Sequence, residues 1–263
     1  MSELSSILAY RGFVFYAIKR DIQAKYINSV MGGLWVLISP LATITLYMVI
    51  FGEIMKARLP NIGDEQTYPI YLCVGIISWG LFFEIVSRSQ GVFLEYRNVL
   101  KTQRFPRVSL LLIVSGGAVV NFLIVFGVFL VFLALTGKFP GVQIIAVVPV
   151  LIVQLVFAFG IGMIAAVLNV FFRDISHASG LMLQFWFWLT PIVYPIGVIP
   201  EGVRDLIYFN PLTSIIAGYQ VIFVEGNWPS WSALGFVSAQ ALLLCLGGYK
   251  LYLWAADELV DAL

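Results

Sequence analysis

The sequence predicts an all-α membrane protein with six transmembrane helices, an amphipathic helix at the N-terminus and a re-entrant helical hairpin between spans 5 and 6. The 263 residues are 61% hydrophobic and 11% charged, with a mean hydropathy of +0.97, whereas a soluble domain carries about 25% charged residues. Asp, Glu, Lys and Arg are absent from seven long segments: 26–52, 66–83, 108–137, 139–172, 175–200, 206–224 and 226–249. A helix needs roughly 20 apolar residues to cross a ~30 Å hydrocarbon core. Segments of this length therefore indicate a membrane.

The segment that precedes the first span has the pattern of a helix with one apolar face. Apolar side chains recur there at three- and four-residue spacing: Val14, Phe15, Ile18, Ile22 and Tyr26. Lys19 and Arg20 fall largely on the other side, so we expect 1–31 to contain an amphipathic helix along the cytoplasmic interface. Such a helix is either an anchor for the first span or a docking surface for a cytoplasmic partner.

The charge-free segments define six spans within a single membrane domain, 1–263. Spans 1–5 occupy 32–199 and the sixth span follows, at about 32–52, 68–87, 109–135, 143–168, 177–199 and 231–251. Lys and Arg favour the cytoplasmic loops. With six spans, eleven Lys and Arg residues fall on the side of the termini and four on the other. Both termini are therefore expected in the cytoplasm.

The window 206–224 is the exception, because its apolar pattern is broken. Asn210-Pro211 interrupts it near its start, and Gly218 lies in the remaining half. Proline removes a backbone donor and restricts the residue before it. The pattern favours a re-entrant helical hairpin that dips into the outer leaflet. The alternative is a seventh span, which would move the C-terminus outside.

The loop after span 2 is short and basic. Residues 88–107 include Arg97, Lys101 and Arg104, and Pro106 would end any helix formed there. We expect a short cytoplasmic helix whose charges set the orientation of the chain. Contact with a partner is compatible with that role.

Several kinds of soluble-enzyme chemistry are excluded. His177 is the one histidine, so no zinc site or catalytic triad built on several histidines is possible, and we expect no metal. Gly137-Lys138 lacks the rest of a phosphate-binding loop, so any ATPase must be another chain. Cys73 and Cys245 lie in apolar segments and are expected to pack rather than to form a disulfide. The net charge of +1 does not suggest binding to nucleic acid.

Glu84 is the one acid well inside an apolar segment. It lies four positions before Arg88, so the two can pair on one helix face, although an ion-coupling role is the alternative. Asp21 and Lys25 have the same spacing in the N-terminal helix.

Aromatic residues are concentrated in the fifth span. The run Phe185-Trp186-Phe187-Trp188 is followed by Pro191, Tyr194 and Pro195. An interfacial aromatic belt explains most tryptophans of the chain. This run is denser than anchoring requires, and the two prolines would distort the outer end of the span.

Several stretches, in order along nearly the whole chain, resemble the permease subunit of bacterial type 2 polysaccharide ABC exporters, particularly those that export lipid-linked O-antigen. The stretches that carry the resemblance are Lys19-Arg20-Asp21-Ile22-Gln23-Ala24-Lys25-Tyr26, Gly32-Gly33-Leu34-Trp35 with Pro40, Phe105-Pro106-Arg107, Asn169-Val170-Phe171-Phe172-Arg173-Asp174-Ile175, the run from Gln184 to Pro195, and Asn210-Pro211.

The resemblance implies a homodimer in the bacterial inner membrane with two separate cytoplasmic ATPase subunits, which would bind ATP and Mg. This chain would be non-catalytic, hold no cofactor, and move an undecaprenyl-diphosphate-linked O-antigen polysaccharide to the periplasm. Export of teichoic acid, capsule or a small molecule by the same fold is one alternative. A membrane-embedded lipid-linked sugar transferase, for which Arg173, Asp174 and His177 are poor candidates, and an ATP-independent or ion-coupled carrier are the others.

The resemblance also implies roles for particular segments and residues. It implies an interface helix at 7–28, a coupling helix at about 91–104 and a conduit between spans 1 and 5. It also implies periplasmic re-entrant gate helices at 203–226, between spans 5 and 6. Aromatic side chains suit a glycan path, for which the candidates are Trp35, Tyr47, Trp186, Trp188 and Tyr194. The candidates for contact with the ATPase or the lipid diphosphate are Arg20, Lys25, Arg97, Lys101 and Arg104. The candidate gate residues are Asn210, Pro211 and Gly218.

Overall fold

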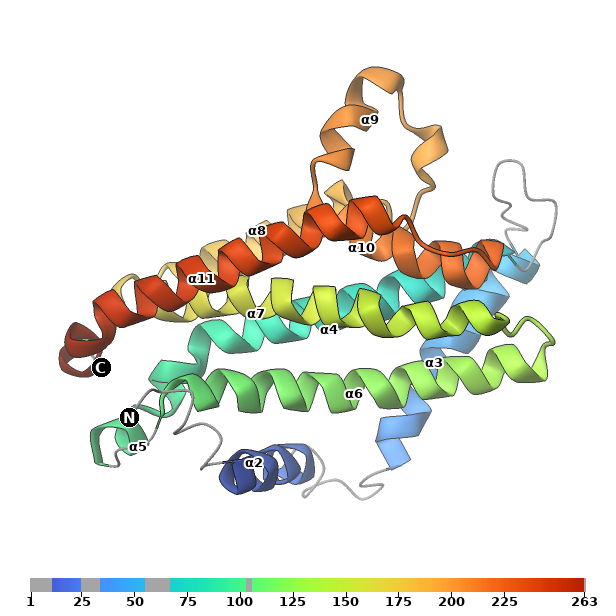
Figure 1. Ribbon diagram of the computed structural model, residues 1–263. Coiled ribbons are helices and arrows are strands. Elements are labelled where there is room, and N and C mark those ends of the chain that lie inside the picture. Colours follow the sequence, from blue (N-terminus) through green and yellow to red (C-terminus); the bar gives the residue numbers. More distant parts are fainter. Residues whose placement is uncertain (1–10, 25–33, 55–66, 103–105, 263) are drawn as a thin grey trace.

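A computed structural model describes residues 11–24, 34–54, 67–102 and 106–262, and every element in those ranges is helical. Long helices run side by side along one axis and form the body of the molecule (Figure 1). They are α4 (Thr67–Glu95), α6 (Val108–Leu135), α7 (Val147–Phe171) and α11 (Trp231–Ala262). The short helix η3 (Val142–Ala146) leads into α7.

Helix α4 lies at the centre of this bundle and contacts both α6 and α7, while α11 packs along α7. In its most apolar stretch 67% of the residues are buried, against 28% in α6, 39% in the η3–α7 helix and 22% in α11. The outer helices therefore keep broad apolar faces for lipid or for another chain.

Within the described residues, four helices are long and apolar enough to cross a membrane: Thr67–Ser89, Val108–Leu135, Val142–Phe171 and Trp231–Ala256. They match the spans predicted at 68–87, 109–135, 143–168 and 231–251. The number six stays a prediction, because the segments at 32–52 and 177–199 form shorter helices.

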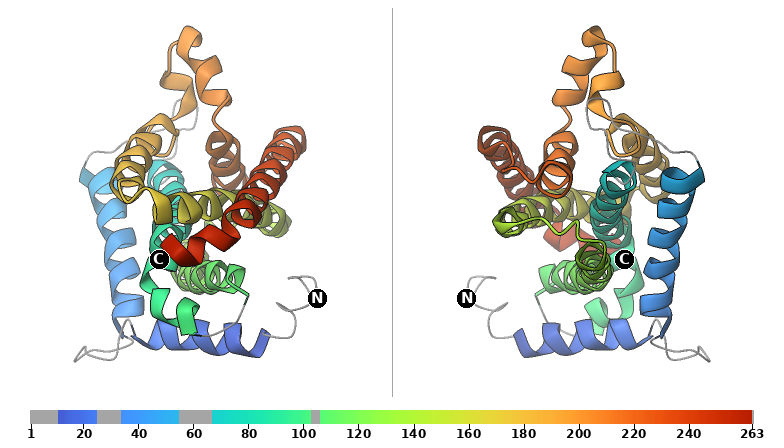
Figure 2. Two further views of the ribbon diagram at one scale, coloured as in Figure 1. Left: turned by 90° about the vertical axis from the view of Figure 1, so that its left-hand side faces the viewer. Right: turned by 90° about the vertical axis from the view of Figure 1, so that its right-hand side faces the viewer.

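The first of these shorter helices is α3 (Trp35–Tyr47), which continues as the π-helix η2 (Met48–Ile54) and is inclined to the bundle beside α6 and α4 (Figures 1 and 2). The second is α8 (Ile175–Leu189). It ends at Leu189 rather than at 199, because Thr190 is extended and Pro191 disfavours a helical conformation at its predecessor.

The segment after α8 contains η4 (Ile196–Val198), α9 (Glu201–Tyr208), α10 (Pro211–Gln220) and the π-helix η5 (Val221–Glu225). The chain bends by 95° between α9 and the helix that follows. Asn210 caps α10 by accepting a hydrogen bond from the Leu212 amide, and Pro211 occupies its first turn. Helix α9 projects away from the bundle (Figures 1 and 2), whereas α10 contacts α4, α7 and α11.

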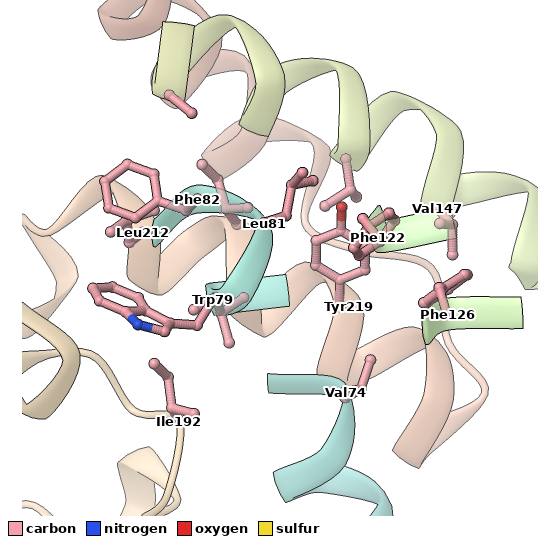
Figure 3. Close-up of a cluster of buried hydrophobic side chains, with 14 of the residues drawn as sticks. Val74, Trp79, Leu81, Phe82, Phe122, Phe126, Val147, Ile192, Leu212 and Tyr219 are labelled. Atoms are coloured by element: carbon pink, nitrogen blue, oxygen red, sulfur yellow. The ribbon is translucent and has the colours of Figure 1, made fainter. Parts of the chain in front are cut away.

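The larger hydrophobic core lies where α10 meets α4, α6 and α7. Figure 3 shows Tyr219 of α10 beside Val74 of α4 and Phe122 of α6, with all three buried. The Tyr219 hydroxyl donates a 2.8 Å hydrogen bond to Oε1 of Gln154, whose Nε2 donates a 2.6 Å bond to the backbone of Ser78. The broken segment is thus fastened to the centre of the bundle through α7 and α4.

A second hydrophobic core occupies the end of the bundle that holds α5 (Arg97–Thr102) and the C-terminal end of α11. Helix α2 (Arg11–Ala24) lies crosswise against α6 near this end (Figures 1 and 2). Val14, Ala17 and Ile18 of α2 pack against the core, whereas Phe15, predicted on the apolar face, is exposed. Both cysteines are free; Cys73 is buried and Cys245 is half-buried.

Candidate functional site

Charged side chains from two helices meet beside α6. Nη1 of Arg88 lies 3.4 Å from Oε1 of Glu84, one turn earlier on α4. Nη2 of Arg88 donates 2.8 Å hydrogen bonds to both carboxylate oxygens of Asp21 on α2. Nδ2 of Asn121 on α6 donates a 2.7 Å bond to the second oxygen of Glu84. The four residues Asp21, Glu84, Arg88 and Asn121, named here the polar cluster, join α2, α4 and α6.

Two adjacent glycines of α6 make room for this contact. A Cβ atom on Gly116 would lie 2.4 Å from the Ile18 side chain of α2. A Cβ atom on Gly117 would lie 2.9 Å from Oδ2 of Asp21 and 3.3 Å from Nη1 of Arg88. Only glycine allows α2 to approach α6 this closely without rearrangement.

A cavity of about 310 Å³ adjoins the polar cluster between α3, α4 and α6. Glu84 and Asn121 line it from one side, and Pro40 and Tyr47 line it from α3. Tyr47, a predicted conduit residue, also packs against Phe51 with a ring-centroid distance of 6.2 Å. Trp35, the other conduit candidate on this helix, begins α3, but the position of its side chain lies outside the described residues.

The aromatic run of α8 is divided between the interior and the surface. Trp186 is half-buried against Phe82 of α4 and Phe157 of α7, at centroid distances of 5.4 and 6.3 Å. Trp188 is 59% exposed. The hydroxyl of Tyr194 donates a 2.6 Å hydrogen bond to the Trp188 backbone oxygen, which folds the chain back after α8. The predicted conduit residues of α8 thus point in different directions.

One of the three predicted gate residues, Gly218, lines a second cavity, of about 440 Å³. Its lining comes from α4, the segment 191–197, α9, α10, η5 and the start of α11, and includes Tyr71, Tyr208, Gly218, Gln220 and Glu225. Gly218 is buried, and a Cβ atom there would contact Val150 of α7 at 3.3 Å. Asn210 and Pro211 form the start of α10. All three predicted gate residues thus help to position α10.

Three of the predicted basic residues, Arg20, Arg97 and Lys101, lie on α2 and α5. Arg20, Arg97 and Lys101 are exposed, so each can reach a partner or a lipid phosphate. Lys25 and Arg104 lie outside the described residues. The predicted coupling segment at about 91–104 is not a separate helix throughout, because α4 continues to Glu95 before α5 begins at Arg97.

A second group of polar contacts connects α4 to α8. Nδ2 of Asn169 donates a 2.8 Å hydrogen bond to the backbone oxygen of Gln90, and Oδ1 of Asn169 accepts one of 3.1 Å from the Ser176 amide near the start of α8. Oγ of Ser179 donates to Oε1 of Gln90. The sequence indicated that Asn169 could form hydrogen bonds between helices, but it predicted neither the partners of Asn169 nor the pairing of Asp21 with Arg88. The adjacent glycines at 116 and 117 were the local signal for the α2 contact, but spacing cannot identify a partner on another helix.

Among the described residues, no group of three or more His, Cys, Asp and Glu side chains could hold a metal ion. Arg173, Asp174 and His177, the weak candidates for transferase chemistry, are exposed where α7 turns into α8. That surface offers one acid beside one histidine, without an enclosing pocket among those described.

Apolar helices of spanning length, together with a part-buried polar cluster and outward apolar faces, define an integral membrane protein. The chain belongs to the ABC-2 type transporter family, whose model matches residues 13–224. It is 29% identical over 255 residues to the O-antigen export system permease protein RfbA of Myxococcus xanthus, covering 96% of this chain and 93% of the relative. A protein of the same name from Klebsiella pneumoniae is 31% identical over 210 residues, 79% of this chain and 78% of the relative. The polysialic acid transport protein KpsM of Escherichia coli is 20% identical over 234 residues, 89% of each chain.

Proposed function

We propose that this chain is the membrane subunit of an ATP-driven exporter that moves undecaprenyl-diphosphate-linked O-antigen across the bacterial inner membrane. The observation that carries the proposal is the similarity to a permease named for O-antigen export over 96% of the chain. A second candidate, export of a capsular polysaccharide, is favoured by the weaker similarity to KpsM over 89% of the chain.

The proposed machine contains two copies of this chain and two copies of a cytoplasmic ATPase that holds ATP and Mg. The exposed apolar faces of α6, α7 and α11 support contact with lipid and with a second copy. Both chain ends and α5 would face the cytoplasm. The described C-terminal end of α11, α5 and the α7–α8 turn lie at one end of the bundle, which supports this orientation (Figure 1).

The proposed topology has six spans and a re-entrant hairpin. In it, α3 with η2 is the first span and α8 is the fifth. The 95° bend between α9 and α10 supports a hairpin that enters and leaves the outer leaflet. Backbone bent at that depth is tolerated where protein buries it, and α10 is largely buried.

In the proposed mechanism, closure of the ATPase subunits pushes on α2 and α5 through exposed residues such as Arg20 and Lys101. Helices α3 and α8 of the two copies line the conduit, where Tyr47, Trp188 and Tyr194 offer aromatic faces to the glycan. Helix α10, positioned by Asn210 and Gly218, gates the outer end.

Proteoliposomes test the proposal directly. The glycolipid is placed in the outer leaflet, and its transport is followed as protection of the glycan from added glycosidase. We expect protection with ATP and Mg only when this chain and its ATPase are both present, and none with a hydrolysis-deficient ATPase. Transport by this chain alone, or ATP hydrolysis by it alone, would contradict the proposal. A parallel assay with a capsular glycolipid decides between the two substrates.

A further inference from the structure

Arg88 occupies the point where the crosswise helix α2 meets the centre of the bundle. Its guanidinium contacts an acid on each side, Asp21 at 2.8 Å and Glu84 at 3.4 Å. The side chains of Arg88, Asp21 and Glu84 are 29%, 22% and 17% exposed, so the ion pairs are largely shielded from solvent. A charge pair in such surroundings is costly to break by removing one partner. A displacement of α2 that keeps the pair intact must therefore act on α4.

The contact between α2 and α6 is also closely packed. Ile18 and Asp21 rest on Gly116 and Gly117, where one added methyl group would clash. Helix α2 therefore packs closely against α6 at these two glycines, and Arg88 contacts it from α4. This combination of close packing and a paired guanidinium fixes the position of α2 more firmly than an apolar contact alone.

The polar cluster is connected to α3 through the cavity that the two share. Glu84, which Arg88 holds, accepts a hydrogen bond from Asn121 and lines the 310 Å³ cavity that α3 closes with Pro40 and Tyr47. A movement of residues 84–88 of α4 would change the shape of that cavity. It would thereby also change the surface against which α3 packs.

The same stretch of α4 reaches α8 in the other direction. Gln90 lies two positions after Arg88, and its backbone and side chain are both bonded to residues that hold the start of α8, Asn169 and Ser179. Because α4 is a continuous helix from Thr67 to Glu95, residues 84 to 90 move as one unit.

We infer that Arg88 is a positioning residue that transmits displacement of α2 to α4, and that residues 84–90 of α4 pass it to α3 and α8. The inference rests on the proposed function for its biological role, since it assigns the route by which a push on α2 reaches the conduit. Transmission along these helices requires that their contacts have two discrete arrangements. Proximity does not establish such transmission, so the coupling between the helices has to be measured.

The first test uses the assembled exporter with Arg88→Gln, Asp21→Asn and the charge exchange Asp21→Arg with Arg88→Asp. We expect each single variant to co-purify with the ATPase and hydrolyse ATP within about twofold of the parent, while export falls about tenfold, a ratio typical of coupling between sites. The charge exchange should recover most of that loss. Lys250→Gln, which removes an exposed positive charge from α11, is the matched control and should export normally.

The second test does not depend on the substrate. A nitroxide label at Leu181→Cys, an exposed position of α8, is placed in a chain whose Cys73 and Cys245 are replaced by Ala. ATP should change the label's spectrum in the parent complex, and Arg88→Gln should abolish the change while hydrolysis continues. Failure of the parent to export O-antigen would reject the proposed substrate, yet this spectral readout would still test Arg88.

Three outcomes would overturn the inference. They are normal export by Arg88→Gln, an ATP-dependent spectral change that survives the substitution, and loss of assembly or hydrolysis together with export. The last outcome would assign Arg88 to folding or docking instead of transmission.

Discussion

The indole nitrogen of Trp186 donates a 2.8 Å hydrogen bond to Oδ1 of Asn210, the residue that caps α10. Nδ2 of Asn210 donates a 2.9 Å bond to Oγ1 of Thr190, and that hydroxyl donates a 2.8 Å bond to the backbone oxygen of Trp186. The three residues form a closed ring of hydrogen bonds between the end of α8 and the start of α10. The aromatic run and the broken segment are therefore one structural unit.

Replacement of Asn210 by Ala should loosen this unit. The change removes a helix cap, at a cost of about 1 kcal/mol, and leaves the Trp186 donor without its acceptor, at a further cost of about 1 kcal/mol or more. We expect a clearly lower thermal unfolding temperature in detergent. Asn210→Asp is the control, because it keeps the acceptor and should lose less. Equal stability of Asn210→Ala and the parent would show that the ring does not hold α10.

Replacement of Tyr219 by Phe should weaken the attachment of α10 to the bundle core. The substitution leaves Oε1 of the buried Gln154 without its hydrogen-bond donor, which costs about 1–3 kcal/mol. Measured by thermal unfolding, the double variant with Gln154→Leu should be more stable than the sum of the single effects predicts. Strict additivity in this cycle would mean that the two side chains do not interact.

A methyl group at Gly160 should separate α7 from α11. Its Cβ atom would lie 2.8 Å from the backbone nitrogen of Cys245 and 3.0 Å from Leu244, and overpacking of this kind costs about 1–3 kcal/mol. Gly160→Ala should therefore unfold at a lower temperature than the parent. Gly127→Ala on α6, where no atom lies within 4 Å of the new Cβ, should be neutral or stabilising. A similar loss in both variants would point to an effect other than helix packing.

Trp186 and Trp188 should respond differently to truncation. Trp186 packs between α4 and α7, so Trp186→Ala should cost about 3 kcal/mol of packing and lower the yield of folded subunit. Trp188 is exposed, so Trp188→Ala should leave stability and assembly with the ATPase unchanged and reduce export if it lines the glycan path. The readouts are unfolding temperature, co-purification and export, and normal export by a folded Trp188→Ala subunit would remove this residue from the conduit.

Long gaps between charged residues were sufficient to predict the central helices. The predicted span at 109–135 corresponds to α6 at Val108–Leu135, and the span at 143–168 to the helix from Val142 to Phe171. The agreement has a simple cause: charges are excluded from the hydrocarbon core, so their positions mark where helices enter and leave it. The break at Asn210-Pro211 was also readable, because a cap followed by proline has a strong local conformational preference.

Contacts between helices were not predictable from spacing. The pattern placed Arg88 within reach of Glu84, one turn away, but could not place Asp21 beside it across 67 positions of sequence. The density of aromatic residues likewise distinguished α8 from the other helices but did not predict the rotation of α8 about its own axis. That rotation turns Trp186 inward and leaves Trp188 at the surface. Which face of an apolar helix is buried depends on the helices that pack against it, and a single sequence does not show which helices these are.

The packing of α2 against Gly116 and Gly117 has a consequence for biosynthesis. Helix α2 is translated before its ion partner Arg88, which follows 67 positions after Asp21, and before the two glycines. Helix α2 can therefore dock only after α4 and α6 have been synthesised. The docking of α2 thus shows that α4 and α6 are in place.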